Sequence, residues 1–254
     1  MDFSFSTSLH TGTSGLLTPI PKREFPPQFQ DKSRLTYYAS LFNSIEINSS
    51  FYKVPMASTM RKWAESVPDD FQFTFKLWKE ITHTRGLLFK QEDLDNFIEV
   101  ISCVGDKMGC LLVQFPPRIN VQHIHQLEKL LFGLKIADPL KRWKVAVEFR
   151  NRSWYEENVY ELLDAHQAAM VFQDLPASSG PLIETAEFIY LRFHGPNGGY
   201  RGSYPDDFLS EYAGYIKDWQ EDGKDVYAYF NNTMGEAVKN LITLNGFVKA
   251  AAES

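Results

Sequence analysis

The chain alternates short runs rich in β-branched and aromatic residues with longer segments that have helical periodicity. The short runs predict eight strands, at Leu9–Thr13, Ser44–Asn48, Phe71–Lys76, Leu111–Phe115, Lys144–Phe149, Ala169–Asp174, Phe188–His194 and Asp225–Asn231. The longer segments predict helices at Lys32–Phe42, Ser58–Ser66, Glu92–Val104, Gln122–Phe132, Tyr155–His166, Asp206–Glu221 and Gly235–Ala250. Strands joined by helical crossovers form either a closed barrel or a doubly wound open sheet.

Alternation within the strands favours the barrel. In Phe71–Lys76 three Phe residues alternate with polar ones, and Ile189–His194 becomes polar in the same way towards its end. Strands of a doubly wound sheet are buried on both faces and read as continuous hydrophobic runs. We therefore predict an α/β fold consisting of one (β/α)8 TIM-barrel domain over residues 1–254, a length usual for such a barrel. The segment Leu175–Glu187 is rich in Pro, Ser and Gly and predicts an irregular connection after the sixth strand.

Polar residues gather at the carboxyl ends of these strands. Because side chains alternate with period two, residues opposite the apolar face should line the barrel interior. The inward polar set comprises Glu46, Asn48, Lys76, Gln114, Glu148, Arg150, Asp174, Arg192, His194, Tyr229 and Asn231. Barrels of this kind hold their active sites at the carboxyl ends of their strands.

The inward charges nearly balance, with three carboxylates and three permanent cations beside one histidine. Such a cluster needs no metal for neutrality, and it can shift carboxyl pKa values in opposite directions. We predict proton transfer by Glu46, Glu148 and Asp174, with His194 as acid–base partner or orienting group. The alternative is a ring of paired charges that only closes the barrel mouth and holds the strand register.

The remaining inward residues predict substrate binding. The charge of an anionic substrate would be neutralised by the cations Lys76, Arg150 and Arg192. The substrate would be positioned by the amides and the phenol of Asn48, Gln114, Asn231 and Tyr229. A glycine-rich segment at 195–204 carries Tyr200 and Arg201 and predicts an anion-binding loop.

Bulk properties narrow the classes of partner. The net charge is −6 with no basic stripe, which argues against extended nucleic-acid binding. Two cysteines without metal-finger spacing indicate a reducing compartment. Because Met1 to His10 lacks a signal-peptide pattern and no apolar run could span a bilayer, we expect a cytoplasmic protein with no membrane partner. We expect no cofactor and no metal, because only His194 is a histidine placed at a strand end.

Several short segments resemble motifs of the YecE-like family, catalogued as domain of unknown function 72. They are GTSG (12–15), EINSSFY (46–52), KLWKEITH (76–83), VQFPP (113–117), VEFRNRSW (147–154), RFHG (192–195), YRGSY (200–204) and YFNNT (229–233). They occur in order over nearly the whole chain. Leu16 stands after GTSG where the family often has an aromatic residue. The resemblance implies a TIM barrel and brings no established reaction.

The sequence thus predicts an uncharacterised YecE-like protein that acts as a metal-independent acid–base enzyme of hydrolase, lyase or isomerase type. Its ligand would be a small polar or anionic metabolite, sugar-like or phosphorylated. Two alternatives stay open: a metal-dependent phosphodiesterase or nucleic-acid-processing barrel, and a non-catalytic ligand-binding module. The sequence makes no prediction about oligomeric state.

Overall fold

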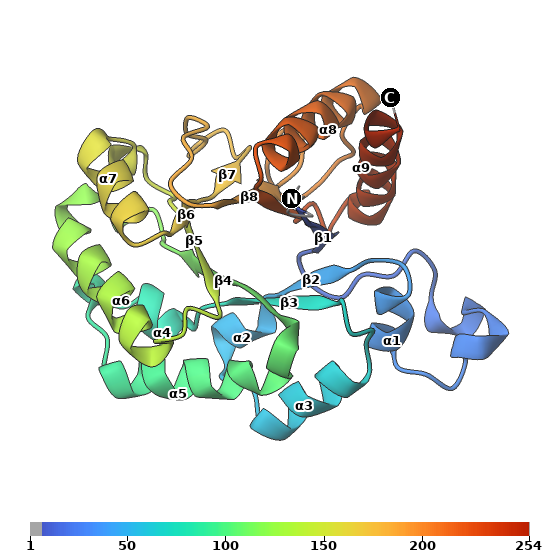
Figure 1. The fold of residues 1–254 in the computed structure, drawn as a ribbon, viewed down its shortest axis with the longest axis horizontal. Helices are drawn as coiled ribbons and strands as arrows, with labels where there is room; N and C mark the ends of the chain where they lie inside the picture. The colour runs from blue at the N-terminus through green and yellow to red at the C-terminus, as the bar shows by residue number, and fades with distance from the viewer. Residues whose placement is uncertain (1–6, 254) are drawn as a thin grey trace, which may run out of the picture.

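The protein is described by a computed structural model that covers residues 7–253. Parallel strands surround a common axis, and helices cover their outer side (Figure 1). The strands are β1 (Leu9–Thr13), β2 (Ser44–Ile47), β3 (Gln72–Lys76), β4 (Met108–Gln114), β5 (Lys144–Glu148), β6 (Ala169–Met170), β7 (Phe172–Gln173), β8 (Phe188–Phe193) and β9 (Asp225–Phe230).

The strands close into a barrel. One run of parallel pairing is β2-β3-β4-β5-β6, and the other is β7-β8-β9-β1. Strands β6 and β7 are two halves of the predicted sixth strand, and Val171 between them still donates a backbone hydrogen bond to Val147 of β5 (2.9 Å). A bridge between Ser14 and Glu46 joins the end of β1 to β2. The predicted (β/α)8 architecture is therefore confirmed.

The helices lie where the crossovers require them. They are α1 (Arg34–Ala39), α2 (Ser49–Tyr52), α3 (Ala57–Glu65), α4 (Lys79–Thr82), α5 (Gln91–Ile101), α6 (Ile124–Ala137), α7 (Glu157–Ala165), α8 (Asp206–Glu221) and α9 (Ala237–Ala252). Short 3-10 turns lie at Lys22–Glu24, Pro27–Phe29, Arg85–Leu87, Ser102–Lys107, Val121–His123 and Arg152–Trp154. The connection from β7 to β8 contains no helix, as its composition predicts. Within residues 7–253, none of the helices has the length and apolarity to cross a membrane.

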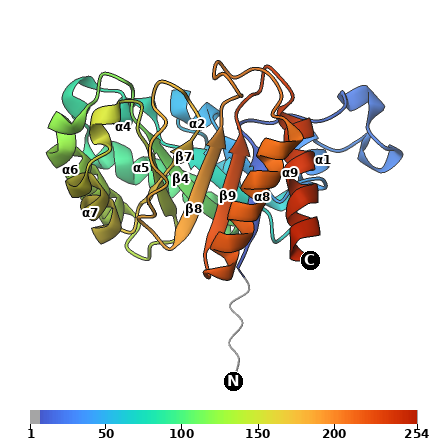
Figure 2. The same ribbon diagram turned by 90° about the horizontal axis from the view of Figure 1, so that it is seen from above.

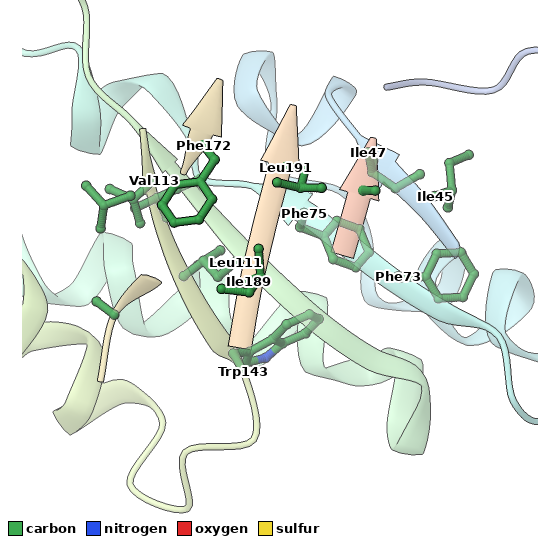
Figure 3. Packing of buried hydrophobic residues seen from close by; sticks show 14 of the residues in the cluster. Ile45, Ile47, Phe73, Phe75, Leu111, Val113, Trp143, Phe172, Ile189 and Leu191 are labelled. Carbon is green, nitrogen blue, oxygen red and sulfur yellow. The ribbon is translucent and has the colours of Figure 1, made fainter. Parts of the chain in front are cut away.

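Side-chain parity separates two apolar layers. Residues such as Phe75, Leu111 and Ile189 point outward and pack against the helices (Figure 3). Their strand neighbours form a second cluster inside the barrel that includes Leu112, Ala146 and Tyr190. The outer layer removes the larger apolar area from water and so supplies most of the hydrophobic stabilisation. The inner layer leaves the carboxyl ends of the strands free for polar groups.

Most element boundaries differ from the predicted ones by a few residues, and two of these differences have a structural cause. Strand β4 begins at Met108, three residues earlier than its apolar run suggests, because Gly109 lets β3 approach closely. Helix α5 ends at Ile101, and the chain continues through a 3-10 turn in which Gly105 has φ +65°. Both differences lie at the amino-terminal end of β4, away from the strand ends that carry the polar set.

Figure 2 shows the orientation of the barrel. The arrowheads of β8 and β9 point to the same edge, where the long loop after β8 and the shorter connection after β9 lie. We call this carboxyl-terminal edge of the barrel, with the loops that follow it, the mouth. Because all strand pairs are parallel, the ends of β2, β3, β5 and β7 lie at the mouth as well.

Gly12 allows β1 and β2 to approach where the barrel closes. A Cβ atom at this position would overlap the carbonyl oxygen of Ser44, which is backbone and cannot move aside. We therefore expect Gly12→Ala to lower the free energy of unfolding by about 1–3 kcal/mol through overpacking. Chemical denaturation followed by circular dichroism measures the effect.

Gly214 provides the matched control. It lies in α8 with open space where an added methyl group would lie, so Gly214→Ala should leave stability equal or raise it by up to about 1 kcal/mol. Equal stabilities of the two alanine variants would contradict the role of Gly12 in barrel closure.

Candidate functional site

Arg192 of β8 lies at the centre of the polar cluster. Its guanidinium binds the Glu46 carboxylate through two hydrogen bonds, Nε to Oε2 at 2.9 Å and Nη2 to Oε1 at 2.7 Å. Its third nitrogen, Nη1, forms an ion pair with Oε2 of Glu148. All three side chains are at most 2% exposed. One cation thus joins carboxylates from β2 and β5 across the barrel.

Neighbouring groups complete the shell around the two carboxylates. The Tyr190 hydroxyl donates to Oε2 of Glu46 at 2.7 Å, and Asn48 Nδ2 donates to Oε1 at 3.2 Å. The second oxygen of Glu148 forms an ion pair with Nε of Arg150. These contacts hold both carboxylates in place, although the Glu148–Arg150 ion pair does not have hydrogen-bond geometry.

The pairing fixes the charge state of the cluster. Burial acts to raise the pKa of Glu46 and Glu148, but Arg192 together with the other cations and hydrogen-bond donors around them outweighs it, so both carboxyl pKa values lie below their ordinary range. Burial likewise opposes the charge of Arg192, and the two glutamates raise its pKa well above the usual value. Carboxylates this firmly ionised are poor proton carriers near neutral pH. The proton-transfer role of Glu46 and Glu148 stays a prediction, and the ion pairs favour a structural role for them.

His194 and Asp174 form a second unit next to the cluster. Burial lowers the pKa of His194 below its ordinary value, although Asp174 opposes the shift, so the ring is neutral at pH 7. Its Nε2 lies 3.1 Å from Arg150 Nη2 and 3.2 Å from Arg192 Nη1, two groups that can only donate. Nε2 is therefore the acceptor, and Nδ1 carries the proton and faces Oδ1 of Asp174 at 3.3 Å.

Asp174 is itself held by the loop that follows β8. It accepts a hydrogen bond from the backbone N–H of His194 at 2.7 Å, and its other oxygen accepts from the Tyr204 hydroxyl. That hydroxyl in turn accepts from the backbone N–H of Gly195 at 2.5 Å. The Asp174 side chain keeps 15% exposure, whereas Glu46 and Glu148 are fully buried, so a ligand can approach Asp174 more readily than these two glutamates.

Lys76 at the end of β3 has a different environment from the arginines. Its ammonium donates to Gln114 Oε1 at 2.7 Å and lies 4.3 Å from the centre of the Phe51 ring. Burial lowers its pKa to about 8, helped by the positive charge of Arg192 and Arg150 and opposed by Glu148 and Glu46. Among residues 7–253 no carboxylate lies within ion-pair distance of Lys76. It is a half-buried amine whose proton is held weakly.

The predicted binding residues are not all equally accessible. Lys76, Asn48, Arg150 and Asn231 are half-buried at the mouth, and Gln114 keeps 9% exposure. Tyr229, in contrast, is fully buried, and its hydroxyl bonds to Ser44 and Thr74 at 2.7 Å each. Its contact with a ligand stays a prediction, and in this structure its hydroxyl connects β9 to β2 and β3.

The glycine-rich loop packs on the mouth. Gly198 N–H donates to the Gly195 carbonyl at 2.8 Å and Tyr200 N–H donates to the His194 carbonyl at 2.9 Å, so these amides are used within the chain rather than free for an anion. Tyr200 places its ring edge-on to His194, 5.8 Å between centroids, whereas Arg201 is exposed to solvent. The loop therefore packs over His194, and these two amides do not form an anion-binding site.

Three contributors to the site lie outside the predicted set. Tyr190 shares the face of Arg192 and His194, so the same parity could have identified it. Phe51 and Tyr204 lie in irregular or short segments after strands, where no periodic pattern shows which way a side chain points.

Two further features bear on ligand binding. Across residues 7–253, no three His, Cys, Asp or Glu side chains converge in a way that could hold a metal ion. A cavity of about 450 Å³ lies elsewhere, lined by residues that include Trp143, Lys144 and Phe188. Because Lys144 and Phe188 begin β5 and β8, this cavity belongs to the amino-terminal edge of the barrel and does not include the ion cluster.

Comparison with known proteins gives the family. The family described as "Protein of unknown function DUF72" matches residues 10–254. The chain belongs to this family. It is 27% identical over 242 residues to UPF0759 protein YunF of Bacillus subtilis (strain 168), covering 83% of this chain and 84% of YunF. It is 28% identical to UPF0759 protein YecE of Escherichia coli (strain K12) over 100 residues, 39% of this chain and 37% of YecE.

Solved structures of DUF72 proteins share the fold. A DUF72 family protein from Enterococcus faecalis V583 superposes with a TM-score of 0.78 at 20% identity, covering 95% of each chain. Another from Thermotoga maritima MSB8 gives a TM-score of 0.74 at 25% identity, covering 97% of this chain and all of the other. The resemblance drawn from the sequence motifs is thus confirmed, and the family description assigns no reaction.

Arg192→Met tests the cluster as a stability element. The change leaves Glu46 and Glu148 buried without their shared cation, which should cost about 3–5 kcal/mol of unfolding free energy at pH 7. The pKa values of both carboxyls are lowered in the folded wild type, so their stabilising contribution is present above the unfolded pKa and is lost as pH falls through the folded pKa. In the variant the orphaned carboxylates gain by protonation, so its deficit should shrink between pH 7 and pH 4.

Urea denaturation at the two pH values measures this difference. Arg23→Met is the matched control, because Arg23 is 82% exposed and forms a surface ion pair with Glu24. A deficit for Arg192→Met no larger than that of the control, or one that grows on acidification, would refute the assignment.

Proposed function

We propose that the mouth of this DUF72 barrel binds a small anionic metabolite and performs acid–base chemistry on it without a metal. The observation that carries the proposal is that Lys76 and Arg150 remain partly accessible while Glu46, Glu148 and Arg192 beneath them are buried. Arg192 and Arg150 together balance the two carboxylates, which leaves the charge of Lys76 without a paired carboxylate among residues 7–253. Lys76 has neutral hydrogen-bonding and ring contacts, so its charge is available to an anionic group.

Arg150 supplies the second binding group. Its Nε pairs with Glu148 and one of its Nη atoms contacts His194, which leaves further donors of a five-donor guanidinium for a carboxylate or phosphate. Asn48 Oδ1 is buried and accepts no hydrogen bond from residues 7–253, so a ligand hydroxyl can satisfy it. These groups match the predicted sugar-like or phosphorylated ligand.

Proton transfer at the accessible part of the mouth is assigned to Lys76, which has a pKa of about 8 and can exchange a proton near neutral pH. His194, oriented by Asp174, is fully buried, so it accepts a proton only if the mouth opens and its Nε2 is released by the two arginines that contact it. The cations around the mouth repel a divalent metal ion, which favours this reading over the metal-dependent phosphodiesterase. Two free cysteines, Cys103 and Cys110, support the proposed cytoplasmic location.

A non-catalytic binding module is the second candidate. It is favoured by the full burial of Glu46, Glu148 and His194, since buried groups meet a substrate only if the mouth opens. Recovery of bound metabolites distinguishes the two: an enzyme releases a changed compound, whereas a binding module releases the compound unchanged.

Arg150→Met tests the anion site. A panel of sugar phosphates and small carboxylates is screened by thermal shift with and without chelator, and hits are followed for turnover by NMR. Because a hydrogen bond to a charged group contributes about 1.5–3 kcal/mol, the variant should bind a hit about 10- to 100-fold more weakly than the wild type. Glu148 keeps its pair with Arg192 in the variant, so we expect the fold to be retained with a smaller loss of stability than in Arg192→Met.

Arg152→Met is the matched control two residues away. Arg152 is exposed and donates to the Pro176 carbonyl, outside the cluster. Binding that is unaffected in Arg150→Met, or that requires a divalent metal, would overturn the proposal.

A further inference from the structure

We propose that Lys76 forms an imine with the carbonyl carbon of an anionic oxo compound whose charged group binds Arg150. The inference rests on the proposed function, because it assigns a ligand class and a covalent step to the same mouth. The ligand class is a short 2-oxo carboxylate or a phosphorylated aldehyde.

The surroundings of Lys76 differ from those of a lysine that only supplies positive charge. A binding lysine is normally held as an ammonium by a carboxylate, whereas Lys76 Nζ donates to the neutral amide of Gln114 at 2.7 Å. Burial and the positive charges of Arg192 and Arg150 oppose protonation of the amine, and together they outweigh Glu148 and Glu46, which favour it. The Phe51 ring at 4.3 Å favours the ammonium, but burial and the arginines outweigh it.

The geometry also suits attack on a carbonyl group. Lys76 reaches the mouth from the end of β3, and the bond to Gln114 uses one N–H, so the lone pair of the neutral amine is free to face the opening. Gln114, which accepts from Lys76, is in register with Glu148 of β5, and Arg150 pairs with Glu148. The two cations therefore lie at neighbouring strand ends and can serve one small ligand. An arginine at position 76 would bind the anion and could not form the imine, because its guanidinium stays protonated.

The step balances without a cofactor. The neutral amine attacks the carbonyl carbon, and the oxygen takes up a proton to give a carbinolamine. Loss of that oxygen as water, with transfer of the remaining amine proton, leaves a carbon–nitrogen double bond, so the net products are the imine and one water molecule. Protonation of the imine then makes it an electron sink for a neighbouring carbon–hydrogen or carbon–carbon bond.

Borohydride trapping tests the inference on the full chain. The protein is incubated with pyruvate or with glycolaldehyde phosphate and reduced, and peptide mass spectrometry locates the secondary amine. At pH 7 an amine with a pKa of about 8 has about a 200-fold larger neutral fraction than an ordinary lysine with a pKa near 10.4. We therefore expect trapping at Lys76 to exceed trapping at Lys79, an exposed lysine three residues away, by at least about tenfold.

Two further readouts make the result specific. The trapping rate should level off above about pH 8, whereas adventitious labelling of surface lysines continues to rise towards pH 10. Lys76→Arg should keep the thermal shift given by the anion and lose the trapped adduct, and Lys79→Arg should keep both.

The outcomes separate the inference from the proposed function. Binding of the oxo compounds that depends on Arg150, with no adduct at Lys76, overturns the imine and leaves the anion site standing. Equal labelling of Lys76 and Lys79 with both compounds also overturns the imine. If neither compound binds and no anion of the wider panel shifts the melting temperature, both proposals fail.

Discussion

The two-carboxylate pairing of Arg192 is the interaction on which the mouth of this barrel depends. A guanidinium with 2% side-chain exposure carries a large desolvation cost, which is offset only because Glu46 and Glu148 meet it from two other strands. The pairing also specifies the strand arrangement, since Glu46 and Arg192 are 146 residues apart and meet only in the closed barrel. The backbone close approach at Gly12 and the bridge from Ser14 to Glu46 bring β2 into that position.

This constraint divides the polar set into a buried support and an accessible layer. The buried support consists of Glu46, Glu148 and Arg192. Both carboxylates stay ionised and the guanidinium stays protonated. Above this support, Lys76 interacts with an amide and a ring, and Arg150 shares its guanidinium between Glu148 and His194. The accessible layer can therefore respond to a ligand, since adding an anion there does not require the buried ion pairs to separate.

The alternation of polar and apolar residues was sufficient to predict the barrel and much of its mouth. The bounds of β1 and α8 agree with the predicted ones, and Glu46, Glu148 and Arg192 meet in the interior as their parity indicates. The alternation of residues shows on which face of a strand a side chain lies. It does not show how far along the barrel axis the residue lies, because that position depends on the stagger between strands. Tyr229 shows the consequence, since it lies on the predicted face but its hydroxyl is used by Ser44 and Thr74.

Residues outside regular strands could not be placed from the sequence. Tyr204 reaches Asp174 from a loop whose course is set by backbone hydrogen bonds such as that from Tyr200 to His194. Phe51 reaches Lys76 from the short helix α2 (Ser49–Tyr52). The sequence also could not show which charged residues pair with each other. That Arg192 binds both Glu46 and Glu148 depends on distances in the folded barrel and not on composition.

A crystal structure at high resolution, grown with an anionic metabolite and with divalent metal available, tests the central claim most directly. We predict that Arg192 stays bound to both Glu46 and Glu148 and that the anion lies against Lys76 and Arg150. A metal ion coordinated by Glu46 or Glu148, with Arg192 displaced from the carboxylates, would contradict this prediction.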